Sequence, residues 1–206
     1  MMLFNTRVPD RARRMLAAAM FLGALGLSAC SPKPVQFKNT DITGSALSAD
    51  FQLQDLDGKP VTKADFAGKQ LVLFFGFTQC PDVCPTTLQN MSEVMKRLGD
   101  DAGKVSVVFV TLDPARDKPE LLKAYVPQFN PSFTALTGTD EQISNAAKGL
   151  RIFYQKVEGK TETSYTFDHT ASAYVVDAKG VLRLMVRHAA SADDVAADLK
   201  ALIRGG

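Results

Sequence analysis

The stretch from Leu71 to Pro85, LVLFFGFTQCPDVCP, decides the fold of this chain. It starts with five consecutive apolar residues, Leu71 to Phe75, and Gly76 bounds them. An apolar run of this length predicts a strand that is buried on both faces, as in a sheet covered by helices on either side. Functional side chains are then expected where this strand ends, because ligand sites of open α/β sheets gather at the carboxyl edge.

Two cysteines, Cys80 and Cys84, follow this strand and are separated by three residues. Beyond them, apolar residues recur at helical spacing, which predicts a helix that starts near Pro85 and ends near Leu98. Pro85 suits the first turn, where its missing N–H costs nothing. Cys84 is therefore expected at a helix N-terminus, whose partial positive charge favours the thiolate that attacks disulfides and binds soft metals.

The order of the remaining elements predicts the fold class. Apolar patterns predict strands over residues 105–112, 133–136, 171–176 and 181–186, and helices over residues 119–125, 139–150 and 191–203. Residues 51–61 form an early hairpin, and the polar residues 154–166 form an excursion from the core. Two strands joined by a helix are expected to be parallel, which brings Cys80 and Asp113 to one sheet edge. This order is that of an α/β, thioredoxin-like three-layer fold with a central mixed sheet, an N-terminal β-hairpin and an inserted excursion before the last hairpin.

The first 29 residues have the features of a secretory signal. Four arginines precede an uncharged run from Met15 to Ala29, which is short for a membrane span. The run ends Leu27-Ser28-Ala29-Cys30, which resembles the lipobox of bacterial lipoproteins, where cleavage leaves the cysteine as the lipid-carrying N-terminus. We predict a lipoprotein signal peptide over residues 1–29, a lipid-anchored flexible tether over residues 30–49 and one domain over residues 50–206. The alternatives are an uncleaved N-terminal helix or an ordinary signal with a stray cysteine.

The charge and the cysteine count both depend on this signal. The whole chain carries 24 basic and 22 acidic side chains, a net charge of +2. The first 29 residues hold four Arg and one Asp, so removing them leaves 20 basic and 21 acidic side chains, a net charge of about −1. The basic character belongs to the signal, and no nucleic-acid partner is predicted. If Cys30 carries lipid, two of the three cysteines remain as a pair.

The spacing of Cys80 and Cys84 has two interpretations. A structural disulfide is common in exported proteins. A functional, redox-active or metal-binding pair is favoured by Pro81 and Asp82 in the loop, by the helix N-terminus after it and by the sheet edge. Across one helical turn, this spacing can direct two sulfurs at one point and leave the third vertex of a trigonal site to another ligand.

His169 is the candidate third ligand. It stands just before the strand predicted over residues 171–176, where the corresponding loop of a thioredoxin fold approaches the thiols and carries a proline that is absent here. The alternative is a hydrogen-bonded loop histidine. The other histidine, His188, lies beyond the last strand. Two thiolates and one imidazole suit Cu(I), and Cu(II) can use the same atoms with an added oxygen, whereas a structural zinc wants four ligands.

Three carboxylates follow or precede the candidate ligands, namely Asp82, Asp113 and Asp168. They are candidates for orienting His169 or admitting copper. Loop capping and turn formation explain them at least as well.

Taken together, these residues resemble the Sco/SenC family of copper chaperones for cytochrome c oxidase. The resemblance covers Gly76-Phe77-Thr78, Cys80-Pro81-Asp82-Val83-Cys84-Pro85, Asp113-Pro114, Arg116-Asp117, Pro119-Glu120 and Asp168-His169. It implies a thioredoxin-like fold, a membrane tether, and copper held by the two cysteines and the histidine. It also implies that an upstream donor supplies copper and that the acceptor is the CuA centre of oxidase subunit II. The chain departs from the pattern at Gln79, which is not a ligand position, and in carrying a lipobox where many relatives have a transmembrane helix.

Three functions compete for this set of residues. We predict a metallochaperone in a bacterial cell envelope, lipid-anchored and facing the periplasm or the outer side. A thiol-disulfide reductase that keeps the cysteines of subunit II reduced is the alternative, with one cysteine attacking and the other resolving. A peroxidase of the peroxiredoxin type fits the fold, but the chain lacks the Pro-x-x-x-Thr-x-x-Cys setting of those enzymes. His169 discriminates best, because a reductase can tolerate its loss and a trigonal copper site cannot.

Overall fold

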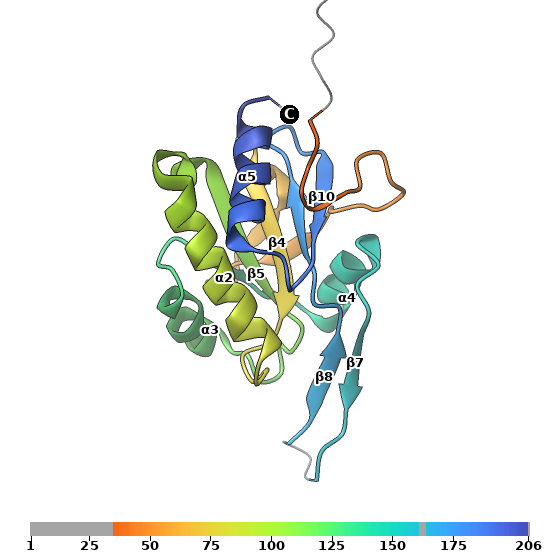
Figure 1. Ribbon diagram of the computed structural model, residues 1–206. Helices are drawn as coiled ribbons and strands as arrows, with labels where there is room; N and C mark the ends of the chain where they lie inside the picture. Colours follow the sequence, from red (N-terminus) through yellow and green to blue (C-terminus); the bar gives the residue numbers. More distant parts are fainter. Residues whose placement is uncertain (1–34, 161–163, 206) are drawn as a thin grey trace, which may run out of the picture. The chain divides into compact units, whose positions relative to one another are not determined.

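A mixed six-stranded sheet forms the centre of the computed structural model, which describes residues 35–160 and 164–205. The strand order is β1-β10-β9-β4-β5-β6. The strands are β1 (Thr40–Asp41), β4 (Gln70–Gly76), β5 (Val105–Thr111), β6 (Thr134–Leu136), β9 (Ala173–Val176) and β10 (Leu182–Val186). The strands β4, β5 and β6 are parallel, and the other pairs are antiparallel (Figure 1). The predicted thioredoxin-like α/β class with a mixed sheet is confirmed.

The central strand β4 is buried along its whole length. Val72 and Phe74 belong to one hydrophobic core, and Leu71 and Leu73 belong to the other. Each fully buried side chain of this size contributes roughly 1.5–3 kcal/mol by leaving water. A shift of one residue would exchange the two faces, so packing on both sides fixes the register of this strand.

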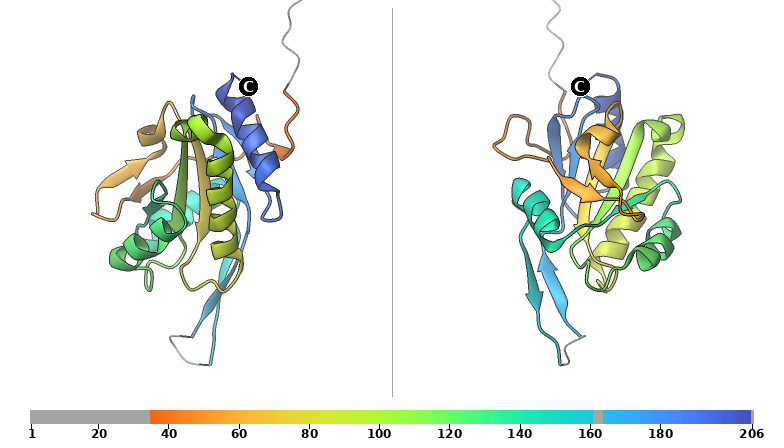
Figure 2. Two further views of the ribbon diagram at one scale, coloured as in Figure 1. Left: turned by 60° about the vertical axis from the view of Figure 1, so that its left-hand side comes forward. Right: turned by 180° about the vertical axis from the view of Figure 1, so that it is seen from behind.

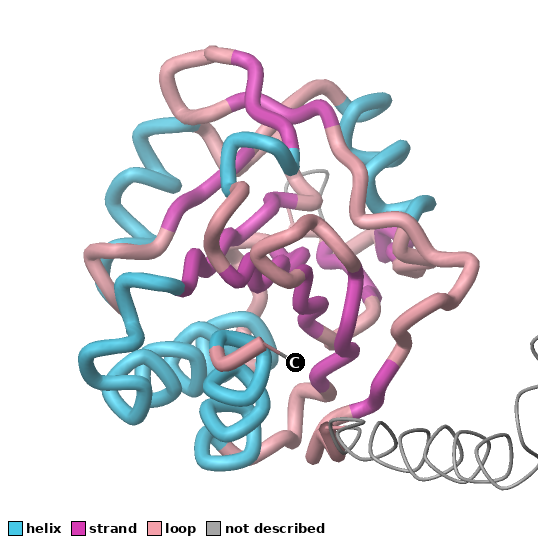
Figure 3. The backbone as a smooth tube through the Cα atoms, turned by 90° about the horizontal axis from the view of Figure 1, so that it is seen from above, coloured by secondary structure: helices cyan, strands magenta, loops and turns pink. Residues whose placement is uncertain are grey.

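Helices cover both faces of the sheet, which makes three layers (Figure 3). The helices are α2 (Val83–Leu98), α3 (Pro119–Tyr125), α4 (Asp140–Gly149) and α5 (Ala192–Ile203), with 3₁₀ turns η2 (Lys63–Phe66), η3 (Gly99–Lys104) and η4 (Val126–Gln128). The first core lies under α2 and α5, and the second lies under α4. Side-chain caps start two of these helices: Thr139 accepts the N–H of Gln142 at 3.2 Å, and Ser191 accepts the N–H of Asp194 at 3.1 Å.

Two separate ribbons stand outside the main sheet. The early hairpin consists of β2 (Gln52–Gln54) and β3 (Pro60–Thr62) and buries Leu53 against the second core. The excursion predicted at residues 154–166 is the ribbon of β7 (Tyr154–Val157) and β8 (Thr166–His169), which projects from the body of the domain (Figures 1 and 2). Since β8 ends at His169, this ribbon carries the candidate third ligand.

The flexible tether predicted for residues 30–49 and the domain boundary predicted at Asp50 need correction. β1 pairs with β10, and the buried carboxylate of Asp198 accepts the backbone N–H groups of Lys38 and Asn39, each at 2.8 Å. Ala49 is also buried. The domain therefore includes the residues from Val35 onward. Hydrogen bonds hold this segment together with scattered apolar contacts, since Phe37 packs against the first core and Ile42 and Leu47 pack against the second.

The signal peptide predicted for residues 1–29 and Cys30 lie outside the described residues. Within the described part of the chain, no helix combines the length and the apolar character that crossing a membrane requires.

Asp198→Ala should release the N-terminal segment from α5. The substitution leaves the N–H groups of Lys38 and Asn39 without their acceptor, which costs about 1–3 kcal/mol of unfolding free energy. We expect this loss in chemical denaturation of the full chain, together with faster amide exchange at residues 38–41. Asp193→Ala is the matched control, because that carboxylate forms a largely exposed ion pair with Arg97, and its removal should change stability by less than about 1 kcal/mol. Equal effects of the two substitutions would contradict this account.

Candidate metal centre

The cysteine loop begins where two parallel strands end together. Gly76 and Thr111 pair at the ends of β4 and β5. The backbone N–H of Leu112 donates to the carbonyl oxygen of Gly76 at 2.7 Å and holds the two exits side by side. The predicted meeting of the Cys80 and Asp113 loops at one sheet edge is therefore confirmed.

The two cysteines occupy different environments, although both are free thiols. Cys84 is fully buried in the first turn of α2, and Cys80 lies in the preceding loop and is partly exposed. The backbone N–H of Cys84 donates to the sulfur of Cys80 at 3.4 Å. The helix N-terminus therefore stabilises a thiolate at Cys80, and the expectation that it acts on Cys84 was wrong. The reason is direction: N–H groups of the first turn point back toward the loop, while the side chain of Cys84 lies in the core.

Gly76 leaves the space that the Cys84 sulfur occupies. A Cβ atom on Gly76 would lie 2.7 Å from that sulfur and 3.0 Å from the ring of Phe109. Non-bonded carbon and sulfur atoms do not approach so closely without displacement. The residue that ends the central strand thus also determines where the buried sulfur sits.

His169 presents a nitrogen lone pair to the thiols. Its Nε2 lies 3.5 Å from the sulfur of Cys84, and its Nδ1 lies 3.0 Å from the carbonyl oxygen of Thr170. A carbonyl oxygen only accepts hydrogen bonds, so the proton of the neutral ring belongs on Nδ1. This backbone contact leaves Nε2 unprotonated, which is the form in which histidine binds metals. Phe77 packs its ring edge-on against the imidazole at 5.9 Å between centroids.

Cys80, Cys84 and His169 form one compact group. Their three donor atoms lie within 4.8 Å of one another. In a trigonal plane, a single ion with metal–ligand distances of about 2.0–2.3 Å holds its three donor atoms roughly 3.7 Å from one another. Small side-chain adjustments are therefore enough to close the group around one ion. Among the residues that the structure describes, this is the one group of three or more Cys, His or acidic side chains with such spacing.

Hydrogen bonding divides the two thiols into a donor and an acceptor. The thiol of Cys84 donates to the sulfur of Cys80, which lowers the pKa of Cys80 to about 4 against the opposing effect of burial. The backbone N–H groups of Cys84 and Asp82 lower the pKa of Cys80 further. The same hydrogen bond, together with burial, raises the pKa of Cys84. The pair therefore holds one thiolate at the open side and one thiol in the core near neutral pH.

A cavity of about 340 Å³ opens onto this group. Its lining consists of Phe77, Cys80, Pro81, Asp82, Val83, Thr166, Phe167, Asp168 and His169. Asp82 and Asp168 are exposed at its rim, and neither belongs to the group of donors. Asp113 does not line the cavity, because it is buried in an ion pair with Arg116. Two of the three predicted carboxylates thus lie at the entrance, and the third lies behind it.

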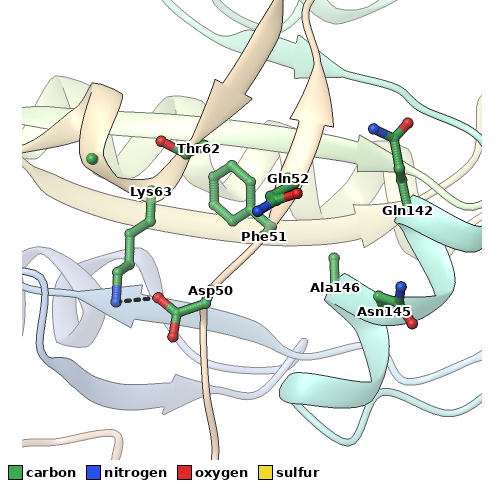
Figure 4. Close-up of a pocket in the computed structure, with 9 residues that line it drawn as sticks. Asp50, Phe51, Gln52, Thr62, Lys63, Gln142, Asn145 and Ala146 are labelled. Carbon is green, nitrogen blue, oxygen red and sulfur yellow. Dashed lines mark ion pairs between the residues drawn. The ribbon is translucent and has the colours of Figure 1, made fainter.

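Of the two histidines, the structure brings His169 to the thiols, as predicted, and it also shows contacts that were not predicted. His188 hydrogen-bonds Thr87 at 2.9 Å and lies outside the donor group. The contacts of Tyr165 and Gln79 with Arg116 were not predicted, since no local pattern marks them. The larger cavity of about 470 Å³ between the early hairpin and α4 contains no thiol or histidine, and an ion pair between Lys63 and Asp50 crosses its edge (Figure 4).

The chain is similar to proteins of one family. The family model described as SCO1/SenC matches residues 39–204. A "SCO2-like protein" of Rickettsia felis is 37% identical over 135 residues, which cover 65% of this chain and 66%, just under two thirds, of the relative. The structure of Bradyrhizobium japonicum ScoI with copper bound is 39% identical, with a TM-score of 0.70 over 76% of this chain and 99% of that one. A SCO1/SenC family lipoprotein from Bacillus anthracis is 30% identical, with a TM-score of 0.63 over 77% of this chain and 96% of that one.

The difference in pKa and burial between Cys80 and Cys84 should appear in their alkylation rates. Iodoacetamide reacts with thiolates, and Cys80 keeps a thiolate well below neutral pH. In the folded, metal-free protein we expect its rate to change less than about twofold between about pH 5.5 and 7.5, while an unfolded cysteine gains about tenfold per pH unit. Buried Cys84 should react far more slowly than Cys80. Peptide mass spectrometry measures both rates, and a Cys80 rate that follows the unfolded control would contradict the assignment.

Proposed function

Because this chain belongs to the SCO1/SenC family, we propose that it binds one copper ion through Cys80, Cys84 and His169 and delivers it during assembly of cytochrome c oxidase. The convergence of two thiols and an unprotonated imidazole nitrogen carries the proposal. The copper-bound structure of the 39% identical relative supports the choice of metal. The motif resemblance supports the CuA centre of oxidase subunit II as the acceptor and an upstream copper donor.

Copper suits this donor set by its chemistry. Two sulfur donors and one imidazole form a soft set of low coordination number, which favours Cu(I), and an added oxygen can complete a Cu(II) site. A structural zinc site uses four protein ligands, and the group contains three among the described residues. The deprotonated Cys80 can take up the ion first, and binding then requires the proton of Cys84 to leave.

Access to the site suits a cargo that is passed on. Cys80 and His169 line the cavity, whereas Cys84 lies in the core behind them. An incoming ligand of the acceptor can therefore approach the open side while the buried sulfur still holds the ion. Stepwise exchange of ligands moves copper between proteins without releasing it to solvent.

The unequal thiols also support a second candidate function, reduction of the cysteines of subunit II. The Cys80 thiolate attacks a substrate disulfide, forms a mixed disulfide and releases one substrate thiolate. Cys84 loses its proton to solvent and attacks the sulfur of Cys80, which releases the second substrate thiolate. The substrate disulfide gains two electrons, and the protein ends with a Cys80–Cys84 disulfide.

We also infer that Cys30 is lipidated and holds the domain in a bacterial cell envelope, facing the periplasm or the outer side. The lipobox sequence and the related lipoprotein of Bacillus anthracis support this anchor. Val35, the first described residue, is five positions after Cys30. Five extended residues span at most about 18 Å, so the domain would stay close to the membrane surface.

Copper binding is tested by anaerobic Cu(I) titration of the reduced protein with native mass spectrometry. We expect one copper per chain, and Cys84→Ser or His169→Ala should weaken binding by more than about tenfold, or 1.4 kcal/mol. His188→Ala is the matched control and should bind normally, because His188 lies outside the donor group. A second equivalent of similar affinity, or full affinity after Cys84→Ser, would rule out the three-ligand site. Disulfide reduction that survives in His169→Ala would identify the thiol function separately.

Cys30→Ser should remove the protein from the membrane without changing its copper binding. The variant loses its two acyl chains, and stable membrane attachment needs two such chains or one with a further signal. We expect it to leave the membrane fraction on cell fractionation while the purified protein binds copper as the unsubstituted protein does. Retention in the membrane, or a copper affinity that falls with that of Cys80→Ser, would refute the role of Cys30 as a simple anchor.

A further inference from the structure

Arg116 occupies a junction between the two segments that carry the candidate ligands. It lies in the loop after β5, where its side chain is 13% exposed and pairs with the buried carboxylate of Asp113. One of its terminal nitrogens, Nη1, donates to the backbone oxygen of Tyr165 at 2.7 Å. The same nitrogen donates to the side-chain oxygen of Gln79 at 3.2 Å. A single guanidinium thus contacts the residue before Cys80 and the residue before β8, the strand that ends at His169.

Tyr165 completes this arrangement. The guanidinium carbon of Arg116 lies 3.5 Å from the centroid of the Tyr165 ring. The hydroxyl of Tyr165 donates to the other carboxylate oxygen of Asp113 at 2.8 Å. Asp113 therefore fixes the guanidinium and the ring together. A planar guanidinium can stack and donate at the same time, which an ammonium group cannot do.

Among the described strands, none of the main sheet pairs with the ribbon of β7 and β8. The position of His169 relative to the thiols therefore depends on its short connection to β9, which starts at Ala173, and on side-chain contacts of the ribbon. Phe167 packs on Phe77 at 5.5 Å between centroids, which is an apolar contact without strong directionality. The contacts of Arg116 supply direction, since each of its hydrogen bonds has a preferred distance and angle.

We propose that Arg116, held by Asp113 and stacked on Tyr165, is a positioning residue that sets the separation of His169 from the Cys80 and Cys84 sulfurs. The proposal rests on the proposed copper site and extends it to residues that do not touch the metal. Of the roles that the sequence left open for Asp113, namely orienting His169, admitting copper and forming a turn, the proposal selects the first and assigns it through Arg116 and Tyr165. Arg116 acts through His169 and not as a ligand.

The test compares Arg116→Gln and Tyr165→Phe with Lys156→Gln. Lys156 lies 4.1 Å from the centroid of the Tyr165 ring but is half-exposed and contacts neither Asp113 nor Gln79 in the described hydrogen bonds, so it is the control. Arg116→Gln should lower Cu(I) affinity by about 10–100-fold, the usual effect of removing a residue that orients a metal ligand. Tyr165→Phe should lower it in the same direction by less, and Lys156→Gln should leave it unchanged.

A double-mutant cycle with His169→Ala separates positioning from general damage. In the His169→Ala background, Arg116→Gln should cost less than about twofold in Cu(I) affinity, because the residue through which it acts is gone. An equal loss in both backgrounds would overturn the proposal. So would full copper affinity in both Arg116→Gln and Tyr165→Phe. If Arg116→Gln does not fold, Tyr165→Phe and Arg116→Lys carry the same cycle.

Amide exchange of the metal-free protein gives a readout that does not depend on copper. Residues 166–169 should exchange faster in Arg116→Gln than in the unsubstituted protein and Lys156→Gln, while β4 remains protected. Unchanged exchange at residues 166–169 in a folded Arg116→Gln protein would refute the positioning role of Arg116. Failure of the unsubstituted protein to bind copper would instead refute the proposed function, and the exchange result would still decide whether Arg116 positions the ribbon.

Discussion

The burial of β4 on both faces is the constraint on which the candidate site depends. Seven consecutive buried residues cannot shift without exchanging two cores, so the end of the strand at Gly76 has a fixed place. The missing Cβ at that end admits the sulfur of Cys84, and the first turn of α2 begins around it. A fully buried thiol is costly to move because the packed core around it leaves no room. The buried sulfur of Cys84 is therefore the fixed point relative to which the other two donors are placed.

The second sulfur is placed by a different interaction, the backbone N–H of Cys84 at the start of α2. A hydrogen bond at a helix N-terminus favours charge, and an exposed loop permits approach, so Cys80 combines a low pKa with access. The three residues between Cys80 and Cys84 allow the two sulfurs to differ in this way. This spacing leaves one cysteine before the helix and one inside its first turn. The same asymmetry suits both proposed functions, copper transfer and thiol exchange, so the thiols alone do not separate the two proposals.

Most of the fold could be predicted because its signals are local. The apolar run at Leu71–Phe75, the helical spacing after Pro85 and the cap at Ser191 each involve a few neighbouring residues. The failures depend on contacts across the chain: β1 belongs to the domain because Asp198 holds the segment before it from far along the chain. The thiols were assigned in reverse because spacing places two cysteines near a helix start without showing which sulfur the N–H groups face. The ring of Tyr165 lies beside an arginine that precedes it by 49 positions, which no periodicity records.

The third donor belongs to a different structural unit from the first two. The strand β4 and the helix α2 hold Cys80 and Cys84 in place relative to the main sheet. His169 instead ends a ribbon that, within the described part of the chain, shares no ladder hydrogen bonds with that sheet. A site assembled from two units has donor separations that depend on how the units are held. Under the proposed copper function, a donor on a separately held ribbon lets the third contact weaken while both sulfurs remain, and that order of events suits a protein that passes its ion on.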